Sequence, residues 1–565
     1  MTNSLRRGDA DTPPPFPTHD GCRVTPLIEA AAMFPEFEEL VLNAERSVWL
    51  AFRVFDPATK ARSAKAEALG LADWSAIIGH VVGRGVEVRI LLSDFEPILA
   101  DHLHAGSWHS FRSLRKMAED FNAAENKLLQ LVVAQHEGEL GWVWRQMLRI
   151  PLRRKVKALI GELIESGSAD GGMLDRPGLW RYVKWEAGRA KTFRPASPPR
   201  MWPATHHQKF AIVDGAVTIV GGIDVDERRW DDKRHRQRAD QTWHDISVRV
   251  EGPACGDVAA HFRALWNREL PRYREVVSEW TTGAARELTL DPLTDVPEAK
   301  APPAIAGGAA SVRVVRTLSR RSGSWFATGP RPCVRELREA HRELILDARR
   351  TLYIEAQFFR SVEAGKWVAE ALRRAPELEI IILVANAPEE IAFEGQGENP
   401  AHKHGEYLQG KVLGRLLRQG HGRLGLFTLA KQQSVDASEK QFEDSRGTAY
   451  GAGVIHIHAK LLIADDARCL VSSANINGRS FNWDTELGCL WRERGDAIAS
   501  FRRTLWSQLL GSDAGADTSL DDWRALAQAN SMTKPEERTG FVVPYQLIRA
   551  RRYARPAWFV PDDLV

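Results

Sequence analysis

The chain is poor in cysteine, and this scarcity excludes one class of architecture. Its 565 residues include five cysteines, an odd number, and no two of them form a CxxC pair. A disulfide framework needs an even set of regularly spaced cysteines, as in small secreted domains. We therefore expect buried free thiols in a reducing compartment.

Long apolar runs and a strong net charge are also absent. No uninterrupted apolar stretch reaches the roughly 18 residues that span a bilayer, and the opening MTNSLRRGDADTPPPF lacks the apolar core of a secretory signal. The 77 basic and 74 acidic residues leave a net charge of +3, which does not favour a dedicated DNA-binding protein. We expect a cytoplasmic or peripheral membrane protein, and export by a signal-less route is also compatible with the sequence.

One short pattern occurs twice: a histidine, a lysine two residues later and an aspartate five residues beyond the lysine. The two copies consist of His207, Lys209 and Asp214, and of His458, Lys460 and Asp465. A polar residue, Asp224 or Asn475, stands fifteen residues after each lysine. Chemistry at phosphorus through a covalent intermediate needs two histidines, one to attack and one to protonate the leaving group. A duplicated fold supplies both.

The sequence around each copy predicts a hairpin. Strands at 207–213 and 217–220 flank a turn at 214–215, and strands at 458–464 and 469–471 flank a turn at 465–466. Side chains two apart on a strand share a face, so each histidine lies beside its lysine. The imidazole attacks phosphorus while the ammonium neutralises phosphate oxygens. The aspartates at the turns, Asp214 and Asp465, are predicted to hold backbone rather than to contact substrate.

The rest of the chain alternates strands with helices. Similar segments at 44–52 and 348–356 each end a helical pattern and begin an apolar strand, and further strands are predicted at 86–92 and 378–384. Such alternation is typical of α/β lobes whose sheets are covered on both faces. The first half is longer, and we place its excess in a helical insert at about 115–194.

The predicted organisation follows from composition. It comprises a loose arm (1–22), a first lobe (23–280), a linker (281–311), a second lobe (312–511) and a C-terminal extension (512–565). The linker is assigned from its Ala-, Pro- and Gly-rich run VPEAKAPPAIAGGAAS.

A family resemblance rests on these segments. HHQKFAIVDGAVTIVGGIDVDERRW and HIHAKLLIADDARCLVSSANINGRSFNWDTEL resemble the two signature motifs of the phospholipase D superfamily. TWHDISVRVEGPA (242–254) and LYIEAQFF (352–359) resemble its phospholipase D branch more than its endonuclease branch. The resemblance covers most of residues 24–510. It implies an α/β fold of two similar α-β-α sandwich lobes in a pseudo-twofold pair, each with a mixed central sheet, and an active site at their junction.

The resemblance also implies roles for individual residues. His207 would be the nucleophile and His458 the general acid, while Asp245 and Glu486 would orient the opposing lobe's histidine. The residues implied to hold the substrate are Lys209, Lys460 and Asn475. Asp224 takes the equivalent place in the first lobe, either as a substrate contact or as a structural hydrogen-bonding group, and we also place Ser473 and His456 at the substrate, His456 as a wall of the pocket. Two positions depart from the family pattern: Ser472 stands where glycine is usual, and Asp224 stands where asparagine is common.

The implied function is a phospholipase D-type phosphodiesterase that cleaves glycerophospholipids through a phosphohistidine. A phosphatidyl transferase such as a cardiolipin synthase, a nuclease and a membrane-binding scaffold stay open as alternatives. We expect no cofactor and no metal, a peripheral contact with a phospholipid membrane surface, no stable nucleic-acid partner, and a monomer with an internal pseudo-dimer. A neutral nucleophile and a protonated acid together predict a bell-shaped pH–rate profile.

Four other segments allow two readings each. Trp142–Lys157 is basic and amphipathic, either an interfacial helix or a surface helix packed on the first lobe. The run 228–238 is either a cationic rim or a solvated loop, and 402–404 (HKH) is either a solvated loop or part of the site's mouth. Glu355 and Gln357 are interpreted as hydrogen-bonding residues near the lobe junction rather than reactants.

Overall fold

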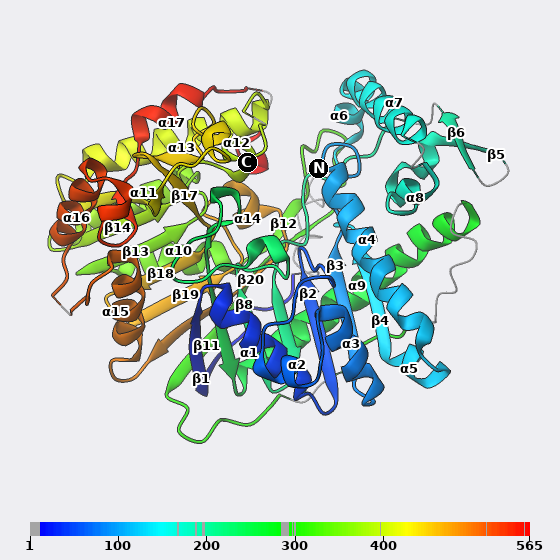
Figure 1. Ribbon diagram of the computed structural model, residues 1–565, viewed down its shortest axis with the longest axis horizontal. Helices are drawn as coiled ribbons and strands as arrows, with labels where there is room; N and C mark the ends of the chain where they lie inside the picture. Colours follow the sequence, from blue (N-terminus) through cyan, green and yellow to red (C-terminus); the bar gives the residue numbers. More distant parts are fainter. Residues whose placement is uncertain are drawn as a thin grey trace, which may run out of the picture.

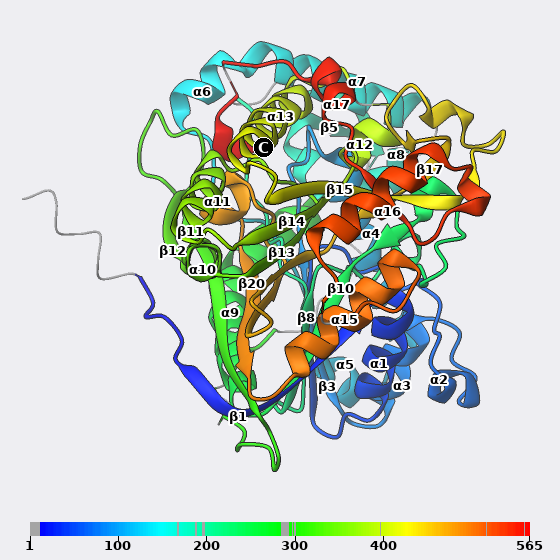
Figure 2. The ribbon, with the colours of Figure 1, turned by 90° about the vertical axis from the view of Figure 1, so that its left-hand side faces the viewer.

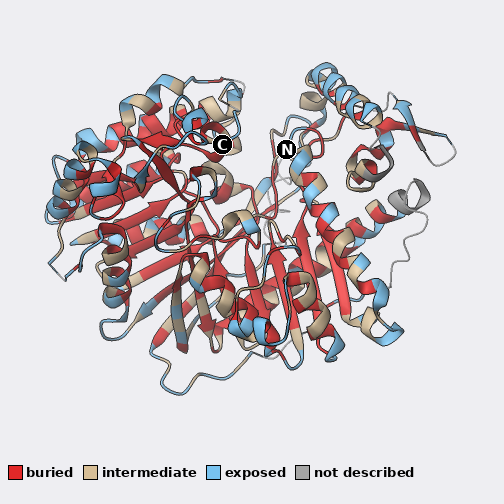
Figure 3. Cartoon of the chain, viewed as in Figure 1, coloured by how far each residue is buried: buried red, intermediate tan, exposed pale blue. Residues whose placement is uncertain are grey.

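The computed structural model describes residues 12–166, 169–186, 189–194, 198–283, 293–296, 298, 301–395, 397–515, 517–558 and 560–565. Two α/β halves meet along a continuous mixed sheet that carries helices on its faces (Figures 1 and 2). The strands are the most buried elements, and exposed residues concentrate on the helices and loops (Figure 3).

The first half contains the following elements of the sheet and its covering helices. They are β1 (Thr18–Ile28), α1 (Ala30–Leu42), β2 (Ser47–Phe52), α2 (Ala64–Ala68), α3 (Trp74–Gly83), β3 (Glu87–Ser93), α4 (Asp101–Met117), α5 (Ala123–Leu128), β4 (Leu129–Ala134), β7 (Phe210–Val213), β8 (Val217–Gly221), β9 (Trp243–His244), β10 (Ile246–Glu251) and α9 (Ala254–Gly283).

The second half repeats the pattern and adds a C-terminal segment. Its elements are β11 (Ala310–Arg320), β12 (Arg331–Arg335), α10 (Glu336–Asp347), β13 (Thr351–Ala356), α11 (Val362–Arg374), β14 (Glu379–Val384), α12 (Glu389–Ala392), α13 (Pro400–Gln419), β15 (Leu424–Ser434), β16 (Thr448–Ala449), β17 (Ala452–Ile457), β18 (Lys460–Ala464), β19 (Arg468–Ser472), α14 (Gly478–Asn482), β20 (Glu486–Glu493), α15 (Ala497–Leu510), α16 (Leu520–Met532), β21 (Val542–Pro544) and α17 (Leu547–Tyr553).

The central strands of the two halves follow one order. The first half runs β1-β10-β8-β7-β2-β3-β4, and the second runs β11-β20-β19-β18-β13-β14-β15. In each half the pairings are antiparallel as far as β2 or β13 and parallel beyond it. This repeat confirms the predicted fold class. The antiparallel pairing of β1 with β11 then joins the two sheets edge to edge.

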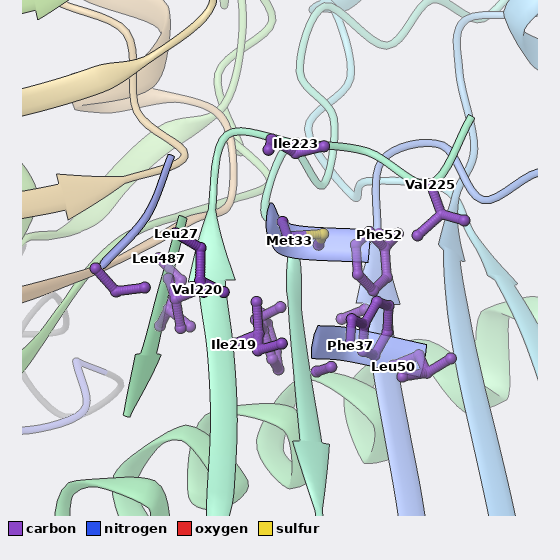
Figure 4. Close-up of a cluster of buried hydrophobic side chains, with 14 of the residues drawn as sticks. Leu27, Met33, Phe37, Leu50, Phe52, Ile219, Val220, Ile223, Val225 and Leu487 are labelled. Carbon is purple, nitrogen blue, oxygen red and sulfur yellow. The ribbon is translucent and has the colours of Figure 1, made fainter. Parts of the chain in front are cut away.

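The largest cluster of buried apolar side chains spans both halves. Phe37 of α1 packs on Phe52 of β2 with ring centroids 5.8 Å apart. Leu487 of β20, from the second half, lies beside Leu27 and Val220 of the first (Figure 4). Burial of apolar surface therefore stabilises the junction as well as each half.

The insert in the first half is shorter than predicted and contains strands. β4 lies within the predicted helical range 115–194 but pairs in parallel with β3, so it is a strand of the central sheet. The extra elements are α6 (Trp142–Met147), α7 (Arg149–Glu165), α8 (Ala169–Leu174) and the hairpin of β5 (Val183–Glu186) and β6 (Arg189–Phe193). An apolar run such as 129–134 has no periodicity that separates a buried strand from a helix.

Two of the segments predicted to lack regular structure contain the beginning of a β-strand. β1 begins at Thr18, inside the arm predicted at 1–22, and β11 begins at Ala310, inside the linker predicted at 281–311. Residues 1–11 and, within the predicted linker, residues 284–292, 297, 299 and 300 lie outside the described part of the chain. β21 of the predicted extension pairs with β15, so this extension adds a strand to the second half's sheet.

All five cysteines are free thiols, and each is buried except the half-buried Cys333. Within the described part of the chain, no helix combines the length and the apolar character needed to cross a membrane.

The motif aspartates accept hydrogen bonds from backbone amides, as predicted, but these amides belong to a neighbouring segment and not to the turn itself. Asp214 and Asp465 occupy left-handed positions in their hairpin turns, with φ of 53° and 54°. The Asp214 carboxylate accepts hydrogen bonds of 2.7–2.9 Å from the amides of residues 45–47, which lead into β2. Asp465 accepts equivalent bonds from residues 349–351 before β13. Each aspartate thus ties the motif hairpin to the neighbouring strand.

We expect Asp214→Ala to lower the free energy of unfolding by about 2–3 kcal/mol, because three amides lose a charged acceptor. Asp465→Ala should have a similar effect in the second half. Chemical denaturation followed by tryptophan fluorescence measures both, and the exposed Asp513→Ala is the control. Equal stability of all three variants would contradict this role.

Candidate active site

The two motif histidines line one cavity of about 300 Å³ between the halves. His207 stands three residues before the first residue of β7, and His458 lies between β17 and β18. Asn475 lines the same cavity. Residues 251 positions apart in the chain therefore face a common space, as the duplicated motif requires for a single site.

Each histidine is held by a carboxylate from the opposite half. Nδ1 of His207 lies 3.0 Å from the Glu486 carboxylate, and Nδ1 of His458 lies 2.6 Å from Oδ2 of Asp245. The backbone repeats this exchange, since the His207 amide donates to the Thr485 carbonyl and the His458 amide donates to the His244 carbonyl. With Nδ1 engaged in this way, Nε2 of each ring is the nitrogen left for chemistry.

The two lysines lie beside their histidines, as the spacing predicted. Nζ of Lys209 is 3.3 Å from Nε2 of His207 and donates to the His207 carbonyl at 2.7 Å. Lys460 donates to the His458 carbonyl and, at 3.4 Å, to Oε1 of Gln357. Both ammonium groups are buried beneath the cavity.

Burial and neighbouring cations disfavour the charged form of both imidazoles. Burial lowers the pKa of His207 well below its usual range, and Lys209 and Arg53 lower it further. Burial likewise lowers the pKa of His458, with Lys460 and Arg229 acting in the same direction. A phosphodiester bound among these groups would bring a negative charge and raise both values.

The pKa values of the surrounding lysines and carboxylates are also shifted in the direction that favours their neutral forms. Burial lowers the pKa of Lys460 to about 7 and that of Lys209 to about 8. Burial raises the pKa of Asp245 to about 6, against the effect of Lys460, and raises that of Glu486 to about 8. Clusters of strongly shifted groups around a cavity are typical of catalytic sites.

The polar residues fifteen positions after each lysine differ in their surroundings. Oδ1 of Asn475 has no hydrogen-bond partner among the described residues, so this side chain is available to a ligand in the cavity. Asp224 is fully buried, where it accepts a 2.9 Å bond from the Val54 amide and lies 3.9 Å from Lys209. Its geometry fits a structural role beside Lys209, one of the two roles that the sequence leaves open.

Ser473 and His456 also lie behind the catalytic side chains. The Ser473 hydroxyl donates to Oε2 of Glu486 at 2.5 Å, so it holds the carboxylate that holds His207. His456 packs edge-on against Trp243, and burial lowers its pKa to about 3. Both side chains thus contact protein groups, and their contact with substrate stays a prediction.

The cavity wall contains further charged residues, and of these the sequence pointed only to Arg229. They are Arg53, Arg229, Arg360 and Arg479, with Glu389, Glu390 and Asp484. A signal for Arg53 exists, since it directly follows β2 as Gln357 directly follows β13. Arg229 belongs to the basic run 228–238, and it lies 3.7 Å above the Trp243 ring and pairs with Glu389. His402, expected in a loop, is in the first turn of α13 and lines the cavity.

A buried ionic network lies beside the site. Glu29, His235 and His244 approach closely enough to share a metal ion. However, His244 is hydrogen-bonded through both ring nitrogens, to Glu29 at 2.5 Å and to Glu355 at 2.9 Å, and His235 bonds Asp231 at 2.8 Å. These groups satisfy one another, and the bond to Glu355 of β13 links the halves.

The chain is similar in sequence to known phospholipases D. No protein-family model matches the chain. Phospholipase D1 of Schizosaccharomyces pombe is 24% identical over 398 residues, which are 56% of this chain and 28% of that protein. Phospholipase D alpha 4 of Arabidopsis thaliana is 24% identical over 389 residues, 55% of this chain and 49% of that protein. The chain thus spans between about a quarter and a half of these relatives.

A solved phosphatidylserine synthase of Haemophilus influenzae Rd KW20 aligns with 87% of this chain at 14% identity and a TM-score of 0.47, covering 87% of that chain. The sequence similarities confirm the resemblance that the two motifs indicated.

The lysines should control the titration of the histidines next to them. We expect Lys460→Met to raise the pKa of His458 by roughly one pH unit and to affect His207 less, because a neighbouring positive charge is removed. Lys209→Met should instead raise the pKa of His207 more than that of His458. Histidine-selective ¹⁵N NMR titration measures both rings in each variant. Equal shifts of the two rings in either variant would argue against this pairing.

Proposed function

Because this chain belongs to the phospholipase D superfamily, we propose that it is a phosphodiesterase that hydrolyses glycerophospholipids to phosphatidic acid and a head-group alcohol. The observation that carries the proposal is the pair of imidazoles from opposite halves that face one cavity, each oriented by a carboxylate of the other half. Two such groups fit a double displacement at a single phosphorus.

In the first step, Nε2 of His207 attacks phosphorus and an N–P bond forms while the P–O bond to the head group breaks. The imidazolium of His458 gives its proton to the departing oxygen, so the head group leaves as a neutral alcohol. Lys209, Lys460 and Asn475 hold the phosphate oxygens as charge shifts onto them. Glu486 stabilises the charge that develops on His207.

In the second step, water attacks the phosphohistidine from the side that the head group has left. His458, now neutral, accepts the proton of that water as the new O–P bond forms and the N–P bond breaks. Phosphatidic acid leaves, and both histidines return to their starting states. An alcohol in place of water would give transfer of the phosphatidyl group at the same site.

The charges at the cavity wall favour a small zwitterionic head group over a nucleic acid. The four arginines attract one phosphodiester, but Glu389 and Glu390 of α12 stand among the same lining residues. Carboxylates at this position would repel the flanking phosphates of a polynucleotide and would attract an ammonium group. We therefore expect choline and ethanolamine phospholipids to be better substrates than polynucleotides.

We expect His207→Ala to reduce release of choline from phosphatidylcholine by about 10⁴-fold or more, because no other group can form the covalent intermediate. The exposed His109→Ala on α4 is a matched control that should keep wild-type activity. Mass spectrometry of the lipid products with and without ethanol identifies the acceptor. Appreciable activity of His207→Ala, or nucleotide release from single-stranded DNA without choline release, would refute the proposal.

The pH dependence should differ between the free and the substrate-bound protein. We expect bell-shaped profiles whose alkaline limb lies at lower pH in kcat/KM than in kcat. Burial, Lys460 and Arg229 lower the pKa of His458 in the free protein, and kcat/KM reports that state. The bound phosphate raises this pKa, and kcat reports the complex. Steady-state rates on a monomeric short-chain phosphatidylcholine from about pH 4 to 9 test the order of the two limbs.

A further inference from the structure

We propose that α6, the start of α7 and the loop 321–329 form a docking surface for a bilayer that contains anionic phospholipid. This inference rests on the proposed function and identifies where the protein would meet its lipid. The docking surface is defined by the exposed side chains of Trp142, Met147, Ile150, Trp325 and Phe326.

These five side chains form a concentration of exposed apolar groups that folding leaves unburied. Among the described residues, eleven large apolar side chains are exposed, and five of them belong to this surface, with 55–71% of each side chain accessible. The rings of Trp142 and Trp325 lie 6.2 Å apart although their segments are separated by more than 180 positions. Exposed apolar groups gathered in this way mark interaction sites.

The protein holds the two segments together rigidly. The Gly141 amide donates to the Ala327 carbonyl at 2.7 Å, and the Val143 amide donates to the Trp325 carbonyl at 3.0 Å. Nε1 of Trp144 donates to the Phe326 carbonyl at 3.0 Å. A Cβ at Gly141 would lie 2.4 Å from the Trp325 carbonyl oxygen, so only glycine allows this approach. The aromatic side chains are therefore presented on a preformed scaffold, which reduces the entropy lost on binding.

Positive charge surrounds the apolar groups. From Trp142 to Gly161 the sequence contains six basic residues, at 145, 149, 153, 154, 155 and 157, and no acidic one. Arg149, Arg154 and Lys157 are exposed and form no ion pair within the described part of the chain. Tryptophan and phenylalanine beside unpaired arginine and lysine match the two layers of an anionic membrane, its acyl boundary and its charged head groups.

The docking surface lies next to the active-site cavity. Gly329, at the end of the loop, packs so closely on Trp483 that an added Cβ would lie 2.7 Å from its ring. Trp483 adjoins Arg479, Ser480 and Asp484, which line the cavity. Figures 1 and 2 both show α6 on the same side of the molecule as the C-terminal segment, whose last two residues also line the cavity.

The same insert is tied to the first motif. The Leu140 amide, just before α6, donates to the Met201 carbonyl at 3.0 Å. Met201 stands six residues before His207, and Trp483 stands eight residues after Asn475, so segments next to the docking surface contact the flanks of both motifs. A bilayer held there would present its head groups at the mouth of the cavity.

Vesicle flotation tests the surface independently of catalysis. We expect the wild-type protein to float with vesicles of phosphatidylcholine containing phosphatidylglycerol, and the double variant Trp325→Ser/Phe326→Ser to bind them about tenfold or more weakly. Arg149→Glu/Arg154→Glu should weaken binding to these vesicles by a similar factor and leave binding to pure phosphatidylcholine little changed. The matched control, Met532→Ser/Ile548→Ser, removes equally exposed apolar groups elsewhere and should bind as the wild type does.

Activity measurements separate this inference from the proposed function. The Trp325→Ser/Phe326→Ser variant should keep its turnover of monomeric short-chain phosphatidylcholine and lose turnover of vesicles. Normal flotation of this variant, or failure of the wild-type protein to float, would overturn the docking surface even if monomeric lipid is hydrolysed. Self-association of the wild-type protein in sedimentation velocity, abolished by the same variant, would instead assign the surface to a second copy of the chain and would also overturn it.

Discussion

The crossed pairing of histidines and carboxylates is the interaction on which the site depends. His207 is oriented by Glu486 and His458 by Asp245, so neither half contains a complete set of groups. A buried Nδ1–H without its acceptor is costly, and the ring would then lose its defined orientation. Three features keep the halves at the separation that these bonds need. They are the pairing of β1 with β11, the short parallel pairing of β9 with β17 and the shared apolar core.

A second set of buried charges reinforces the same junction. Burial opposes a charged imidazole at His244, yet Glu29 and Glu355 raise its pKa well above the usual range. His244 therefore bridges α1's entry segment and β13 as a cation between two carboxylates. The His244 carbonyl also accepts a hydrogen bond from the His458 amide. Since His244 directly precedes Asp245, this bridge fixes the segment that carries the Asp245 carboxylate. Replacement of one member would leave an uncompensated buried charge.

The repeated motifs, the alternation of strands and helices and the family resemblance together predicted the two-lobed α/β class. The histidine–lysine neighbours could be predicted because spacing along a strand determines which side chains share a face. The sequence did not predict β4, since a buried parallel strand has no alternating pattern. It missed Arg53 and Arg360, whose positions depend on how two distant loops meet. It also did not indicate the contacts of Ser473 with Glu486 and of His456 with Trp243, which arise only in the folded chain.

The cation cluster connects the stability of the site with its chemistry. Burial lowers the pKa values of Lys209 and Lys460, and a neighbouring cation lowers each further, Arg53 for Lys209 and Lys209 for Lys460. The phosphodiester of the proposed substrate would offset the repulsion between these cations and so would favour their charged forms. In the proposed reaction, the charge on the phosphate oxygens would change as the N–P bond forms. Cations that are already in position can stabilise the new charge distribution without moving. Water must reorient to do the same, so fixed buried charges lower the activation barrier more effectively.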